Sequence, residues 1–153
     1  MSHRFFRRLK DSTGTSMVEA ALVTPLFLLL TFAIVDFASL LYAYLALEHG
    51  VSQASRYGIT GSVSGELSRE DSMRLAMHNA TPSLTIPDDQ ITFTHLKPGE
   101  AVWRAGVGDP GDVAKITVNY TWTLFTPLVN RFFTDGEINF QVESAMLSER
   151  SFE

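Results

Sequence analysis

The residue with the clearest chemical consequence is Glu19, a single carboxylate at the start of a long apolar stretch. The stretch runs from Met17 to Leu47 with hardly an interruption. A carboxylate at the edge of hydrocarbon loses hydration and needs a compensating group, either an opposite charge or the positive N-terminal end of a helix. Glu19 therefore predicts either charge pairing with another group or simple stabilisation by the helix that contains it.

Other residue patterns offer little support for catalysis. No serine or histidine arrangement fits nucleophilic catalysis, and the chain has no cysteine. The histidines His49, His78 and His95 lack the spacing of metal ligands. Residues Gly106 to Gly111 match the glycine pattern of dinucleotide-binding loops, but we expect a strand after them instead of the helix that such a loop requires. We therefore expect a protein that is not an enzyme and that needs no cofactor or metal.

The apolar stretch is long enough to cross a membrane as one helix. A bilayer core of about 30 Å is spanned by roughly 20 apolar residues, and residues Ala20 to Val35 contain no charged side chain. A cleaved secretory signal would have a shorter apolar region of about 7–15 residues, so we favour a membrane-embedded helix. Pro25 lies inside this segment and removes a backbone donor, which predicts a kink or a local softening of the helix.

The charges on the two sides of the apolar stretch predict its orientation. Before Gly14 the basic residues outnumber a single aspartate; they are Arg4, Arg7, Arg8 and Lys10. The chain beyond Asp36 is acidic overall, and the whole chain has a net charge of −5. Because basic flanks stay in the cytoplasm, we expect a cytoplasmic N-terminus and an exported C-terminal part. An acidic exported part argues against binding to nucleic acid.

Asp36 is a second carboxylate, near the far end of the apolar stretch. At a rise of 1.5 Å per residue it lies roughly 24 Å beyond Ala20, in the outer part of the hydrocarbon core. Two interpretations are open: the side chain reaches the outer headgroups and water, or it contacts a partner helix. The small residues Ser39 and Ala43, four positions apart, favour packing against another helix.

The exported part predicts a small α+β domain. The long helix is expected to continue to Tyr57 and stop at Gly58, followed by a connector and a short helix that starts near Ser68 and ends before Pro82. Alternation of apolar and polar residues predicts antiparallel strands within residues 115–125, 138–142 and 91–93. The predicted fold is therefore a long N-terminal transmembrane helix followed by a small exported domain with a short helix and an antiparallel sheet of about three strands.

The segment between the two longer strands, Thr126 to Thr134, is more apolar than a hairpin turn needs to be, and we call it the tip segment. Its large apolar residues are Leu128, Val129, Phe132 and Phe133. One interpretation is that they close the end of the core or dip toward the outer leaflet. The other is that they form a surface for a partner, since exposed apolar patches mark interfaces.

The residues around the apolar stretch resemble those of the TadE-like family, minor pseudopilins of the tight-adherence (Flp pilus) secretion system of bacteria. The resemblance rests on the run from Gly14 through Val18-Glu19 to Pro25, on Ile34-Val-Asp-Phe37 and on Gln53-Ala-Ser-Arg-Tyr-Gly58. It implies that a prepilin peptidase cuts between Gly14 and Thr15. Together with the charge pattern, it predicts three regions, namely a basic cytoplasmic leader peptide (1–14), a transmembrane and stem helix (15–58) and an extracytoplasmic domain (59–153).

The same resemblance implies a function in assembly of a type IV pilus and in surface adhesion. The protein would lie in the lipid of the bacterial inner membrane, with other pilins, pseudopilins and inner-membrane assembly proteins as partners. Cleavage would leave a free amine on Thr15 that a neighbouring subunit could place against Glu19, so Glu19 is implied in assembly or in recognition by the peptidase. The alternative is an uncleaved, signal-anchored periplasmic binding module of a secretion or pilus assembly complex.

Overall fold

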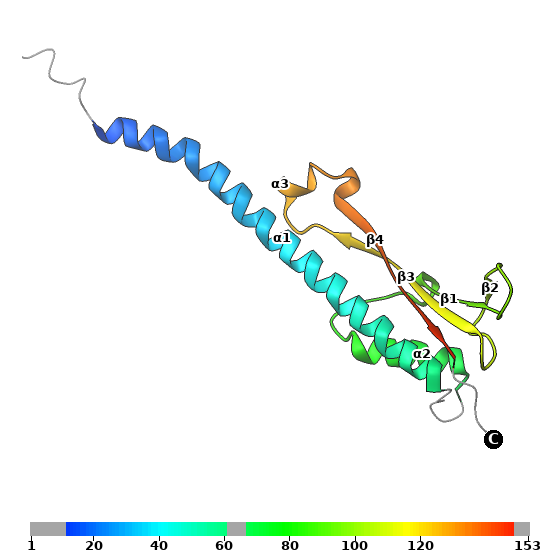
Figure 1. Ribbon diagram of the computed structural model, residues 1–153. Helices are drawn as coiled ribbons and strands as arrows, with labels where there is room; N and C mark the ends of the chain where they lie inside the picture. Colours follow the sequence, from blue (N-terminus) through cyan, green and yellow to red (C-terminus); the bar gives the residue numbers. More distant parts are fainter. Residues whose placement is uncertain (1–11, 61–66, 149–153) are drawn as a thin grey trace, which may run out of the picture.

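The computed structural model describes residues 12–60 and 67–148 of the 153-residue chain. One very long helix carries a small domain along its C-terminal half (Figure 1), and the predicted α+β fold is confirmed. Residues 1–11 of the predicted leader and residues 61–66 of the predicted connector lie outside the described residues. The helices and strands, in chain order, are α1 (Ser12–Thr60), α2 (Arg69–Ala80), β1 (Ile91–Leu96), β2 (Arg104–Ala105), β3 (Val113–Thr123), α3 (Pro127–Asn130) and β4 (Glu137–Leu147).

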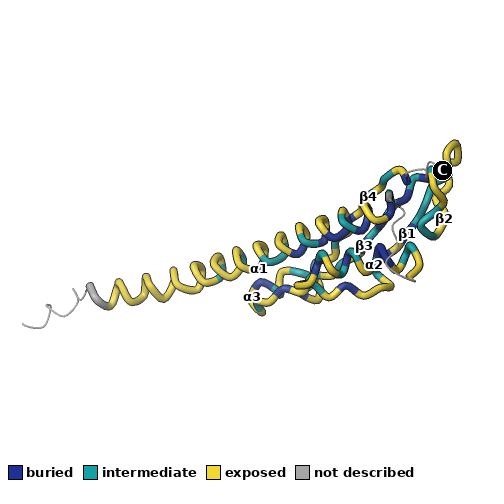
Figure 2. The backbone as a smooth tube through the Cα atoms, turned by 90° about the horizontal axis from the view of Figure 1, so that it is seen from below, coloured by how far each residue is buried: buried dark blue, intermediate teal, exposed yellow. Residues whose placement is uncertain are grey.

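Helix α1 divides into two halves that differ in what covers them. From Gly14 to Val35 nearly every residue is exposed, and the helix is unbroken through Pro25. From Asp36 onward one side of the helix is buried by the domain, as the colour change along the tube shows (Figure 2). We call residues 14–35 the anchor half and residues 36–60 the packed half.

The C-terminal end of α1 differs from the prediction. The helix continues to Thr60, so the expected stop at Gly58 is wrong. Gly58 is buried against α2, where an added Cβ would lie 2.9 Å from Cε of Met73. Its carbonyl accepts a hydrogen bond from Nη2 of Arg69. A glycine at position 58 therefore serves the close approach of two helices and not the termination of one.

Helix α2 begins and ends as the sequence predicts. Ser68 is its N-cap, and the Ser68 Oγ accepts a hydrogen bond from the N–H of Asp71 at 3.1 Å. Met73 and Met77 are buried in the core that α2 shares with α1. The two helices come close because position 50 of α1 is a glycine, at which an added Cβ would lie 2.5 Å from Cγ2 of Thr81.

The domain contains a four-stranded antiparallel sheet in the order β2-β1-β3-β4. The three predicted strands are present, whereas β2 was not predicted, because two residues are too few for an alternating pattern to be visible. One face of the sheet packs against α1 and α2. The core is formed by Leu47, Val51 and Ala54 of α1, Met73 and Met77 of α2, and Ile91, Phe93, Ile116, Val118 and Val142 of the sheet, together with Ile86.

Arg69 connects three segments at the end of the domain that lies away from α3. Its Nη1 donates to the carbonyl of Gly108 at 3.3 Å, and its Nη2 donates to the carbonyl of Gly58 and to Oγ of Ser148 at 2.7 Å. Gly108 belongs to the glycine-rich loop, which leads into strand β3 and not into a helix, as expected. The arginine thereby holds the end of α1, this loop and the end of β4 together.

Candidate functional site: the anchor half and the tip segment

The residues of the predicted processing site lie in the first turns of α1. Gly14, Thr15 and Glu19 are exposed, and nothing lies within 4 Å of the place where a Cβ of Gly14 would be. The first turn of a helix has backbone N–H groups without intrahelical partners, so local unwinding at Gly14 breaks few hydrogen bonds. Thr15 and Glu19 are four residues apart and therefore lie on the same side of the helix.

The anchor half has the dimensions of a membrane span. Residues 14–35 extend about 33 Å at 1.5 Å per residue, against about 30 Å for a bilayer core. Within the described ranges, α1 is the helix that is long and apolar enough to cross a membrane, and its most apolar part is not buried. These properties suggest a membrane anchor. The domain begins to cover the helix at Asp36, directly after this span.

Asp36 connects the helix to the chain at the tip segment. Its side chain is fully buried. Oδ1 accepts a hydrogen bond from the N–H of Phe125 at 3.0 Å, and Oδ2 accepts one from the N–H of Thr126 at 3.2 Å. Two charge-assisted hydrogen bonds compensate for the hydration that the buried carboxylate loses.

The environment of Asp36 differs from the expectation that its side chain reaches headgroups and water. The carboxylate is enclosed by the protein's own fold, which brings two backbone donors to it from 89 and 90 residues away. The small residues nearby also make their contacts within the protein itself. Ala43 is fully buried by the protein's own domain, and Oγ of Ser39 donates to the carbonyl of Val35 in its own helix at 2.8 Å. Ala43 therefore lets the domain approach α1 closely.

The tip segment divides into attached and exposed side chains. Val129 is only 4% exposed, and the ring of Phe133 packs edge-on against Phe37 of α1 with 6.2 Å between the ring centroids. Leu128 and Phe132 are 48% and 74% exposed. The four residues singled out in the sequence thus do not form one surface, because two of them attach the segment and the other two extend from it.

One aromatic residue that the sequence analysis did not single out extends the exposed part. Phe125 is 70% exposed and directly precedes the tip segment. Its ring contacts that of Trp122 in an edge-on arrangement with 5.4 Å between the centroids. The alternation of strand β3 could have identified Phe125. Every second residue there faces solvent, as Thr121 and Thr123 do, and Phe125 is the next in this series.

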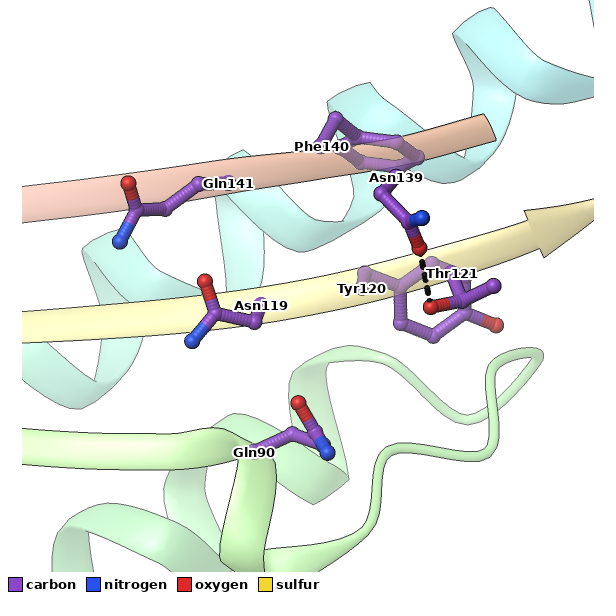
Figure 3. Close-up of a pocket in the computed structure, with 7 residues that line it drawn as sticks. All are labelled: Gln90, Asn119, Tyr120, Thr121, Asn139, Phe140 and Gln141. Carbon is purple, nitrogen blue, oxygen red and sulfur yellow. Dashed lines mark hydrogen bonds between the residues drawn. The ribbon is translucent and has the colours of Figure 1, made fainter. Parts of the chain in front are cut away.

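The sheet carries a separate pocket of about 380 Å³ (Figure 3). It is lined by Gln90, Asn119, Tyr120, Thr121, Asn139, Phe140 and Gln141. Oγ1 of Thr121 donates to Oδ1 of Asn139 at 2.5 Å. Burial raises the pKa of the Tyr120 phenol, which keeps the group neutral. These amide and hydroxyl groups can form hydrogen bonds with a ligand, but this set of side chains brings no strong acid, base or nucleophile together.

The part of the chain that resembles a known protein family lies within α1. A family model described as a TadE-like protein matches residues 14–56. This match confirms the resemblance inferred from the sequence, and it covers the whole anchor half and most of the packed half. Neither a curated protein nor a solved structure matches the chain significantly.

Proposed function

We propose that this chain, in which residues 14–56 match the TadE-like family, is a membrane-anchored minor pseudopilin. In this role it supports assembly of a tight-adherence (Flp) pilus and hence surface adhesion. The observation that carries the proposal is that the matched segment coincides with an exposed apolar helix that is long enough to span a bilayer. The protein acts as a substrate of a peptidase and as an assembly component, not as a catalyst.

The proposed processing step is cleavage between Gly14 and Thr15 by a prepilin peptidase. Two features support it. Both residues are exposed at the start of α1, and the first turn can unwind at low cost to present an extended bond to the enzyme. Glu19 would be the residue that the peptidase recognises one turn further along.

The proposed location is the bacterial inner membrane with a cytoplasmic N-terminus. The basic residues before Gly14 would remain on the cytoplasmic side. The anchor half would cross the bilayer, and the domain would begin on the periplasmic side at Asp36, the point at which the structure starts to cover α1. The acidic domain would then lie outside the membrane, where it can contact other pilins and assembly proteins.

Processing would create the charge that Glu19 needs. The new N-terminal amine of Thr15 is cationic below a pH of about 8, and Glu19 lies on the same side of the helix. A neighbouring subunit could place its amine against Glu19, which would set the axial register of the two helices. A buried charge pair is stable only when both members are present, so an unprocessed chain would pack poorly.

The experiment that tests this function is the intact mass of the membrane-extracted protein from cells with and without a prepilin peptidase. We expect a chain that starts at Thr15 in cells with the enzyme and a full-length chain in cells without it. Glu19→Leu should impair cleavage or pilus assembly. The matched control is Glu48→Leu, because Glu48 is an exposed glutamate of the packed half.

Retention of residues 1–14 in peptidase-containing cells would overturn the processing step. The chain would then be a permanently anchored periplasmic binding module of a secretion or pilus assembly complex. Normal cleavage and normal pilus assembly in the Glu19→Leu protein would instead remove the role of Glu19 and leave the anchor in place.

A further inference from the structure

The exposed apolar side chains at and beside the tip segment gather at one end of the domain. They are Phe125, Leu128 and Phe132, with exposed fractions of 70%, 48% and 74%. Helix α3 lies at the end of the domain that faces the anchor half, whereas β2 lies at the opposite end (Figures 1 and 2). The apolar side chains are therefore at the end of the domain that is next to the exposed part of α1.

Three contacts determine where along α1 this surface lies. Asp36, the first residue after the anchor half, accepts hydrogen bonds from the N–H groups of Phe125 and Thr126. The ring of Phe133 packs against Phe37. Leu128 lines an apolar groove together with residues of the anchor half from Met17 to Phe32. The surface therefore begins where the span ends and extends toward the span.

A helix that spans the bilayer with its anchor half would place this surface in the outer leaflet. Boundary regions between headgroups and acyl chains favour aromatic and large apolar side chains. Water is a poor environment for three such side chains at one end of a domain. The surface is continuous with the apolar surface of the anchor half through the groove that Leu128 shares with it, and this continuity identifies lipid as its occupant.

We propose that Phe125, Leu128 and Phe132 insert into the outer leaflet and form a second membrane contact beside the transmembrane helix. Trp122, whose ring packs against Phe125, then lies at the headgroup level. Two points of attachment hold the domain at one angle to the membrane, where a helix alone would allow it to tilt. The inference depends on the membrane span and not on leader cleavage or on a role in a pilus.

The chain offers a matched pair of fluorescent probes, because it contains only two tryptophans. Trp122 lies beside the proposed contact. Trp103 lies at the other end of the sheet, where Nζ of Lys115 is 4.5 Å from the centre of its ring. Lys115 and Trp122 are seven residues apart on β3, which corresponds to about 23 Å along the strand. Trp103→Phe leaves the near probe, and Trp122→Phe leaves the remote one.

The test is quenching of tryptophan emission in vesicles of brominated phosphatidylcholine, with the full chain inserted and insertion verified by vesicle flotation. In the Trp103→Phe protein we expect loss of most of the emission of Trp122. The loss should be greater when the bromines are near the headgroup than when they are near the bilayer centre. In the Trp122→Phe protein we expect the emission of Trp103 to be retained.

A further substitution distinguishes insertion of the apolar side chains into the leaflet from mere proximity of Trp122 to the membrane. Phe132→Ser in the Trp103→Phe background should reduce the quenching of Trp122, and Phe132 is exposed enough for the domain to remain folded by circular dichroism. Three results would overturn the proposal: equal quenching of the two tryptophans, absence of quenching of Trp122 in the flotation-positive protein, or quenching that Phe132→Ser leaves unchanged. Absence of quenching would make the same surface a contact for another protein chain.

Discussion

The two halves of helix α1 differ both in composition and in surroundings. The anchor half is apolar on all sides, and its side chains are exposed; the packed half is exposed on one side and buried by the domain on the other. A helix that is apolar all round needs an apolar solvent. A helix with small residues on one side can instead accept another element at short distance. The comparison shows that a single unbroken helix can be anchor and scaffold at once.

The buried side of the packed half explains how the domain is attached. Gly50, Ala54 and Gly58 lie on this side, and glycine at positions 50 and 58 leaves space that side chains of α2 and Thr81 occupy. Leu47 and Val51 fill the space between α1 and the sheet. The anchor half shows no comparable division into buried and exposed sides within residues 14–35.

The largest difference between the halves is expected in the free energy of unfolding when a buried leucine is truncated. Leu47 is fully buried, so Leu47→Ala should reduce the free energy of unfolding of the domain by about 2–5 kcal/mol. Leu26→Ala in the anchor half and Leu45→Ala on the exposed side of the packed half should change it by less than about 0.5 kcal/mol. The measurement is urea unfolding of the full chain in detergent, followed by near-ultraviolet circular dichroism. An equal loss for Leu26→Ala would show that the anchor half also stabilises the domain.

A smaller effect is expected at the boundary between the halves. Asp36→Leu leaves the N–H groups of Phe125 and Thr126 without their acceptor, and an unsatisfied buried donor costs about 1–3 kcal/mol. Hydrogen exchange at these two amides should accelerate by at least about tenfold, which corresponds to about 1.4 kcal/mol. Asp36→Asn keeps one acceptor and should show an intermediate rate. Unchanged protection in the Asp36→Leu protein would mean that Asp36 does not hold the tip segment.

The smallest effect is expected at Gly58, one of the two glycines of the packed half, and Gly50 provides the comparison. Gly50→Ala places a Cβ 2.5 Å from Cγ2 of Thr81, a stiff and buried side chain, and should destabilise the domain by about 1–3 kcal/mol. Gly58→Ala meets the flexible end of Met73 at 2.9 Å. Here the gain of about 1 kcal/mol in helix propensity should offset the contact.

Urea unfolding in detergent compares the two alanine proteins directly. A domain destabilised equally by both substitutions would show that Met73 cannot move aside. Stabilisation by Gly50→Ala would show that α1 and α2 are less closely packed than the structure indicates.

The sequence by itself determined the features that depend on composition and period. An uncharged run from Ala20 to Val35 requires an apolar environment whatever the rest of the chain does. The alternation in residues 115–125 allows one face of a strand to be buried and not the other, and Ser68 with Asp71 defines a helix start from local hydrogen bonds. The TadE-like resemblance also lies within one continuous segment. These features involve residues that are close in the chain.

The tertiary structure alone decided the partners of residues that are far apart in the chain. The donors of Asp36 come from Phe125 and Thr126, and no local pattern connects these positions. The division of the tip segment into attached Val129 and Phe133 and exposed Leu128 and Phe132 follows from where α1 lies. Gly58 resembles a helix stop in the sequence, but its role depends on Met73 of a second helix. Local chemistry sets which residues form an element, whereas packing decides which of its sides meets protein, membrane or water.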